Sequence, residues 1–218
     1  WRFLTAGESH GPALSVIIDG LPSGLQLAED DINRDLARRQ QGYGRGGRMK
    51  IEQDRVVILS GLVGAQTSGA PLSLQIENRD WPNWKGRELP ALTVPRPGHA
   101  DLAGMIKYGL RDARPVLERA SARETAGRVA AGAVARRFLA AFGIHIGSYV
   151  VEIGGIVAQV SSADIAQLLA RAEESQVRCP DPHAAQEMMR RIDEANEQGD
   201  SLGGVFVVTA TGVPPGLG

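Results

Sequence analysis

The stretch RETAGRVAAGAVARRFLAAF, residues 123–142, is the clearest helical pattern in the chain. At helical spacing, one face of it carries Gly127, Ala131, Val134, Ala135, Phe138 and Phe142. Small residues on a helix are typical of close packing against neighbouring elements. The pattern therefore predicts a buried, tightly packed helical layer.

Strand and helix patterns flank this helix on both sides. Strands are predicted over residues 12–20, 49–59, 72–76, 148–156 and 203–211. Further helices are predicted over residues 30–41, 101–110, 161–173 and 181–198, with Ser161 or Ser162 capping the third and residues 60–71 rich in turns. Antiparallel-type strand runs alternating with helices indicate an α+β fold, or a layered sandwich with helices against antiparallel sheets. We expect residues 1–218 to form a single domain.

Composition excludes several classes of protein. Of 218 residues, 43% are hydrophobic and 22% charged, as in ordinary soluble globular proteins. The formal net charge of −1 provides no general attraction for nucleic acid or an anionic membrane. No apolar run approaches the ~18 residues of a membrane span, and no signal peptide is recognisable. The single cysteine, Cys179, excludes an internal disulfide and favours the cytoplasm.

Two glycine-rich blocks in the first fifty residues carry chemistry. In Gly7–Gly11 (GESHG), His10 stands between small residues beside Ser9 and can donate a proton near neutral pH; the alternative is a capping serine beside a surface histidine. Arg39 precedes GYGRGGR, residues 42–48, which contributes Arg45 and Arg48. Guanidinium groups bind phosphate and carboxylate through paired hydrogen bonds. A solvated basic turn is the alternative.

A third block, residues 96–101 (RPGHAD), is a turn fixed by proline and glycine. It presents Arg96 and His99 at defined angles, and Asp101 either caps the following helix or orients His99. A rigid surface turn is the alternative. His10 and His99 lie far apart in the sequence and no H-x-x-x-H occurs, so no metal site is expected.

The fourth block lies at the start of the long helix and contains Arg119, Ala120, Ser121 and Arg123. A helix N-terminus with a serine and two arginines is suited to an anion. Ser121 followed by Glu124 is also a capping box, and both interpretations can hold together. The four blocks predict an arginine-rich pocket with two histidines, which suits a polyanionic substrate and a proton-assisted loss of phosphate.

The four blocks resemble, in order, the signature blocks of chorismate synthase. They are GESHG, GYGRGGRM, RPGHADLAG with the following Lys107–Tyr108, and RASARETAGRVAAGA. The resemblance implies a helical layer packed between antiparallel sheets, a cytoplasmic homotetramer and a requirement for reduced FMN. It implies a carbon–oxygen lyase that eliminates phosphate from 5-enolpyruvylshikimate 3-phosphate in the 1,4-anti sense, the last common step of the shikimate pathway to aromatic amino acids.

The same resemblance implies roles for individual residues. His10 would protonate the departing phosphate, and His99 would stabilise or protonate the reduced flavin. Substrate anions would be held by Ser9, Arg39, Arg45, Arg48, Arg96 and Arg123. Flavin contacts would come from Arg119, Ala120 and Ser121. Arg39 and Arg45 also match positions linked to a nicotinamide cofactor, so NADPH is a candidate reductant for the flavin.

The family's chain is much longer than 218 residues. We therefore expect residues 1–218 alone neither to bind FMN tightly nor to turn over substrate. Two other functions stay open on the residues themselves. One is a non-catalytic anion-binding or assembly module in which the arginines make subunit contacts. The other is RNA binding by the basic loop, which the near-neutral charge and 5% aromatic content disfavour.

Overall fold

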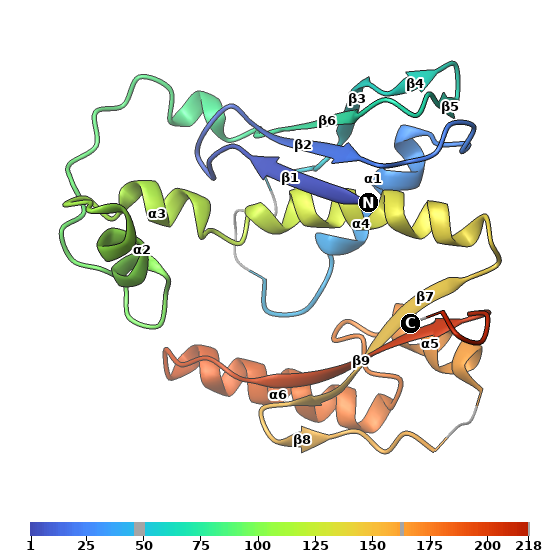
Figure 1. The fold of residues 1–218 in the computed structure, drawn as a ribbon. Helices are drawn as coiled ribbons and strands as arrows, with labels where there is room; N and C mark the ends of the chain where they lie inside the picture. The colour runs from blue at the N-terminus through green and yellow to red at the C-terminus, as the bar shows by residue number, and fades with distance from the viewer. Residues whose placement is uncertain (46–50, 162–163, 218) are drawn as a thin grey trace. The chain divides into compact units, whose positions relative to one another are not determined.

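The computed structural model describes residues 1–45, 51–161 and 164–217 (Figure 1). The chain forms two compact units, each with its own sheet and helices. The first contains Trp1–Arg39 and Arg48–Arg137; the second contains Gln40–Gly47 and Phe138–Gly218. The basic loop predicted around residues 42–48 is therefore divided between the two units.

The first unit is built on a four-stranded antiparallel sheet. Its order is β1 (Arg2–Ala6), β2 (Ala13–Asp19), β6 (Leu72–Glu77) and β3 (Val56–Ser60). Alternate residues of β2 and β6 are buried, because successive side chains of a strand point to opposite faces. Two shorter strands, β4 (Leu62–Val63) and β5 (Gln66–Thr67), pair as a hairpin between β3 and β6.

Helix α4 (Glu124–Ala140) lies along one face of this sheet (Figure 1). At Gly127 an added Cβ would lie 3.3 Å from side-chain carbons of Thr5 on β1 and Val16 on β2, so the missing side chain allows close approach. The buried residues of α4 are Ala126, Gly127, Ala130, Ala131, Ala133 and Val134. Of the predicted face, Gly127, Ala131 and Val134 are buried, whereas Ala135 and Phe138 are half-buried and Phe142 is exposed beyond the end of the helix, so that half of the prediction was wrong. Helix α1 (Glu29–Arg39) adds the fully buried Ile32 and Leu36 to the core.

A pair of short helices completes the first unit. After the one-turn helix η2 (Trp81–Asn83) the chain is irregular until α2 (Asp101–Tyr108), which is followed by α3 (Arg114–Arg119). The two helices pack closely, because a Cβ added to Gly104 would lie 2.5 Å from Val116. The sequence analysis did not predict α3, whose six residues are too few for a clear helical period.

The second unit contains a three-stranded antiparallel sheet with two helices. Its order is β8 (Ile156–Val157), β7 (His145–Ile153) and β9 (Gly204–Thr211). Helices α5 (Ile165–Glu174) and α6 (Pro182–Glu197) supply its hydrophobic core. That core contains Leu168, Ala172, Cys179, Ala184, Ala185 and Met188.

The prediction of an α+β fold is confirmed, with helices on antiparallel sheets. Two further local predictions were wrong. Of the strand expected over residues 49–59, residues 49 and 50 lie outside the described residues, and the strand begins only at Val56. Residues 60–71 contain the predicted turns together with the β4–β5 hairpin. Helix α5 is capped by Asp164, whose carboxylate accepts from the backbone amides of Ala166 and Gln167, and not by Ser161. Ser162 lies outside the described residues. The single domain stays a prediction.

Candidate active site

The GESHG block forms the turn between β1 and β2. Gly7 has a φ of +102°, and a Cβ there would collide with the carbonyl of Ala13, so only glycine fits. The amide of Asn78 donates to the carbonyls of Glu8 and Gly11, at 3.0 and 2.7 Å. The sheet therefore holds the turn that presents Ser9 and His10 in a fixed shape.

His10 is held by Glu118 at the end of α3. The ring Nδ1 lies 2.8 Å from Oε1 of Glu118, and the backbone amide of His10 donates to Oε2 of the same carboxylate at 2.8 Å. A carboxylate oxygen only accepts, so Nδ1 carries the proton in this contact. The contact becomes an ion pair whenever the imidazole is protonated.

The ring of His10 also packs against Trp84. The two ring centroids are 3.9 Å apart and the planes are inclined by 41°. Trp84 is held in turn, because its indole N–H donates to Asp80 at 2.8 Å. The His10 side chain keeps 23% of its surface exposed, so it is both fixed and accessible.

Ser9 joins the first block to the fourth. It is 1% exposed, and its hydroxyl accepts from the hydroxyl of Ser121 at 2.9 Å. The Ser121 oxygen also accepts from the amide of Arg123 at 3.3 Å. The capping box predicted between Ser121 and Glu124 was wrong, because the Glu124 carboxylate instead accepts from Thr5 and pairs with Arg119 at 3.1 Å.

Arg123 and Arg39 share one buried carboxylate. Asp54 has no exposed side-chain surface; one oxygen accepts from Arg123 and the other from Arg39, at 3.1 Å for the latter. Arg123 also donates to Asn78 at 2.6 Å and lies 3.8 Å from Glu52. Arg123 is surrounded by these acceptors and is only 5% exposed. Buried guanidinium groups require such partners, since an unpaired buried charge is very costly.

Arg39 links the start of helix α4 to the buried carboxylate of Asp54. Besides Asp54 it donates to the hydroxyl of Thr125 at 2.9 Å and to the carbonyl of Ala122 at 3.0 Å. Its side chain is 9% exposed. Three hydrogen bonds therefore fix the orientation of the Arg39 guanidinium group within the protein itself.

Arg119 faces the GESHG turn. It donates to the carbonyl of Gly7 and pairs with Glu124. Its neighbour Ala120 is exposed where α3 ends. Of the three residues predicted to contact a flavin, Arg119 is thus committed to protein partners, Ser121 is half-buried, and Ala120 is open.

In the third block, Asp101 takes neither of the two roles predicted for it. Arg96 makes a two-pronged ion pair with Asp101, at 2.8 Å for each nitrogen, and its backbone amide donates to the same carboxylate at 3.1 Å. Hydrogen bonds from Arg96 lower the pKa of Asp101 to about 2, and the pair raises the pKa of Arg96. Asp101 therefore neither caps α2 nor hydrogen-bonds His99, which is exposed with Nδ1 donating to the carbonyl of Pro97 at 2.9 Å.

The structure joins most of the predicted site residues through one network in the first unit. The members are Ser9, His10, Arg39, Arg119, Ser121 and Arg123. Arg96 and His99 lie in the same unit on the α2 turn, without a bond to that network among the contacts described. Arg45 is exposed in the second unit, and Arg48 lies outside the described residues.

Sequence reasoning missed the partners that hold these residues. They are Glu52, Asp54, Asn78, Trp84 and Glu118. Glu118 immediately precedes the fourth block, and this adjacency was the one signal available. The others belong to no local motif, because Glu52 and Asp54 precede β3, Asn78 follows β6 and Trp84 follows η2, and they meet the site only in the folded chain.

The described residues offer neither a metal site nor a membrane-spanning helix. Within residues 1–45, 51–161 and 164–217, no three His, Cys, Asp or Glu side chains gather closely enough to hold a metal ion. In the same part of the chain, every helix is too short or too polar to cross a bilayer.

Comparisons with known proteins agree with this geometry. The family model described as chorismate synthase matches residues 1–218. A chorismate synthase of Desulforudis audaxviator is 58% identical, and one of Symbiobacterium thermophilum is 56% identical; each alignment covers 100% of this chain but 58% and 59% of the relative. A solved structure titled "Crystal Structure of Chorismate Synthase" superposes with a TM-score of 0.80 at 45% identity, covering 100% of this chain and 60% of that one. The chain thus spans about three fifths of the length of these relatives, and it belongs to the chorismate synthase family.

Proposed function

We propose that the protein containing this chain eliminates phosphate from 5-enolpyruvylshikimate 3-phosphate to give chorismate. The observation that supports this most directly is His10, which is partly exposed, anchored by Glu118 and seated on the same turn as Ser9. Membership of the chorismate synthase family supplies the substrate.

In this proposal His10 acts as the acid. The carbon–oxygen bond breaks with its electron pair on the phosphate, whose oxygen takes the proton from the imidazolium. The C–H bond lost in the same elimination leaves its electron pair in the new carbon–carbon double bond and releases its proton to solvent. A positioned acid contributes roughly 10²–10⁴-fold to such a step. Fixed donors around the leaving group add to this, because they stabilise charge that develops in the transition state.

The arginines would divide between binding and support. Arg39 keeps some exposed surface and is pre-oriented, so we propose that it touches a substrate anion. Arg123 is so deeply buried that we propose a supporting role, in which it fixes Asp54 and thereby Arg39. Arg96 has 37% of its side chain exposed despite its pair with Asp101 and stays a proposed anion contact. Arg45 and Arg48 stay proposed contacts from the family resemblance.

The turn between α3 and α4 fits part of a flavin site. Ala120 and Ala122 are exposed and have no side chain beyond Cβ, so a planar ring or a phosphate could approach the backbone. Ser121 offers a hydroxyl, and His99 would contribute an exposed imidazole whose Nδ1 is already engaged. Arg119 fits less well as a direct contact and would instead hold the turn. When bound, reduced FMN would supply electron density for a C–H bond that these side chains cannot activate.

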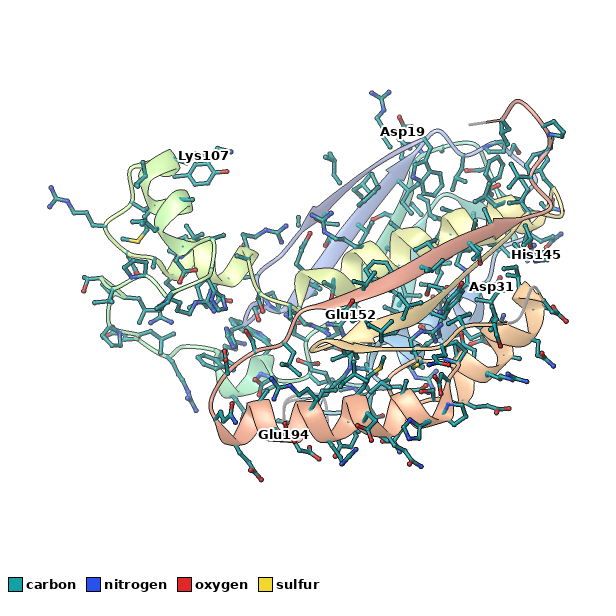
Figure 2. The ribbon with its side chains drawn as sticks, turned by 90° about the horizontal axis from the view of Figure 1, so that it is seen from below. Asp19, Asp31, Lys107, His145, Glu152 and Glu194 are labelled. Atoms are coloured by element: carbon teal, nitrogen blue, oxygen red, sulfur yellow. The ribbon has the colours of Figure 1, made fainter. Side chains whose placement is uncertain are left out.

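The test is phosphate release by the protein at its natural length, without oxygen, with FMN either reduced or oxidised. Release with reduced FMN alone is the expected result. His10→Ala should lower the rate roughly 10²–10⁴-fold, whereas His145→Ala, on β7 and labelled in Figure 2, should not. No release from folded protein would overturn the proposal in favour of a non-catalytic anion-binding module.

We further propose that the protein is a homotetramer in the cytoplasm and that NADPH can reduce its flavin, with Arg39 and Arg45 as matching positions. Light scattering of the natural-length protein tests the tetramer. Flavin reduction by NADPH in the absence of any added reductase tests the cofactor role, and Arg39→Ala should slow that reduction if the residue serves it.

A further inference from the structure

We infer that Glu118 is a positioning residue for His10, fixing the tautomer and the orientation of its ring. The kinetic part of this inference rests on the proposed function; the structural part does not. Glu118 lies 108 residues from His10 in the sequence and meets it only in the folded chain.

Both oxygens of the Glu118 carboxylate contact His10. Its Oε1 accepts a hydrogen bond from the ring Nδ1 of His10, and its Oε2 accepts one from the backbone amide of the same residue, each at 2.8 Å. The backbone carbonyl of Glu118 also accepts from the amide of Ser9 at 3.3 Å. The side chain is only 11% exposed, so the contact is shielded from solvent competition.

This arrangement has a chemical consequence for the ring. Since Nδ1 donates to Glu118, the neutral ring carries its proton on Nδ1, and the proton exchanged with another group travels through Nε2. After giving up the proton on Nε2, the ring therefore returns to one defined neutral form, with its remaining proton on Nδ1 beside Glu118.

Trp84 restrains the ring from a second direction. Its indole packs on His10 and is itself fixed by Asp80. Other charged groups around the turn are Glu8 within it, Arg119, which donates to the carbonyl of Gly7, and Arg87, which lies over the Trp84 ring at 5.7 Å. The contact with Nδ1 comes from Glu118, and we therefore assign the tautomer to it.

Glu118→Gln tests this assignment in a measurable way. The amide oxygen of glutamine can satisfy the backbone N–H of His10, which leaves its NH₂ group facing Nδ1. The neutral ring would then carry its proton on Nε2 instead. Imidazole ¹⁵N chemical shifts of His10 should show this exchange of tautomer in Glu118→Gln and the wild-type tautomer in Glu118→Asp, which keeps the charge.

The kinetic arm uses phosphate release by the natural-length protein. Glu118→Gln should lower kcat roughly 10- to 100-fold, the usual effect of removing a supporting partner, with KM nearly unchanged. In a His10→Asn background Glu118→Gln should have no further effect, since its role passes through the ring.

A matched control is Glu194→Gln on α6, labelled in Figure 2, which loses an exposed contact with Arg191. It should leave tautomer and rate unchanged. An unchanged tautomer together with full kcat in Glu118→Gln would overturn the inference. If wild type releases no phosphate but the tautomer still exchanges in the variant, the proposed function fails and the positioning role stands.

Discussion

At the residue scale, the site depends on charges that are matched inside the fold. Asp54 is fully buried between Arg39 and Arg123, and Asp101 is nearly buried against Arg96. Charges in such places persist only with partners at hydrogen-bond distance. These pairs explain why several arginines of the motifs are half-buried or buried rather than solvated.

The buried pair predicts a large stability effect for Arg123→Met. The variant removes one of the two cations that balance the buried charge of Asp54. Removing one partner of a buried ion pair lowers the free energy of unfolding by about 3–5 kcal/mol. Arg136→Met is the control, because Arg136 pairs with Asp35 at the surface with 42% of its side chain exposed. It should cost about 0–1 kcal/mol. Urea unfolding followed by tryptophan fluorescence measures both, and equal losses would contradict the assignment.

The Arg96–Asp101 pair predicts a pH-dependent contribution to stability. The pKa of Asp101 is lowered to about 2 by Arg96, so the ionised form is favoured in the folded state. Its contribution is present above the unfolded pKa of about 3.9 and is lost as pH falls toward 2. Asp101→Asn should therefore cost about 1–2 kcal/mol at pH 7, after allowance for the exposure of Arg96.

Urea midpoints of wild type and Asp101→Asn should converge as pH is lowered from 7 toward 2. A difference that stayed constant with pH would show that the substitution acts through packing and not through the charge of Asp101.

At the element scale, small residues determine how closely helices approach. Gly127 lets α4 approach β1 and β2, and Gly104 lets α2 approach α3. Glu118 is the fifth residue of α3, so the packing of α2 against α3 helps to set the position of the carboxylate that contacts His10. Packing far from the ring thus contributes to its position.

This packing predicts opposite effects for two helical glycine substitutions. Gly104→Ala should destabilise by about 1–3 kcal/mol, because the new Cβ would lie 2.5 Å from Val116 and overpacking outweighs helix propensity. Gly132→Ala on α4 has nothing within 4 Å and should stabilise by about 0.5–1 kcal/mol. Val116→Ala should restore much of the loss in the Gly104→Ala background, as measured by thermal unfolding.

At the scale of the whole molecule, two compact units share one chain. Helix α4 runs through the division: its residues up to Arg137 belong to the first unit and those from Phe138 to the second. The chain also passes between units at residues 39–40 and 47–48. Because a helix forms cooperatively along its length, we expect the two units to unfold together as one domain.

Met188→Ala tests that expectation. Met188 is fully buried in the second unit, and its loss should cost about 2–5 kcal/mol. Trp1, Trp81 and Trp84 all lie in the first unit, so tryptophan fluorescence reports on that unit alone. A single domain should show the same shift of midpoint by fluorescence and by circular dichroism. A fluorescence midpoint left at the wild-type value would show two independent domains.

The sequence by itself determined the class of fold, most helices and strands, and the residues of the four blocks. Periods of two and 3.6 residues are local, and so is the capping chemistry of glycine and aspartate. Local patterns failed at three places. Strand β3 begins later than predicted, and α3 has too few residues to show a helical period. Glu124 contacts Thr5 and Arg119, which are distant or lie outside the predicted motif, instead of forming a capping box with Ser121.

Only the tertiary structure decided which residues hold the site. Glu118 reaches His10 across 108 residues, and Asp54 reaches Arg123 across 69. These meetings depend on strand register and on the docking of α3 and α4, which no spacing in the sequence encodes. The sequence thus supplied the histidines and arginines of the four blocks, whereas long-range packing fixed the partners, charge balance and orientation of those side chains.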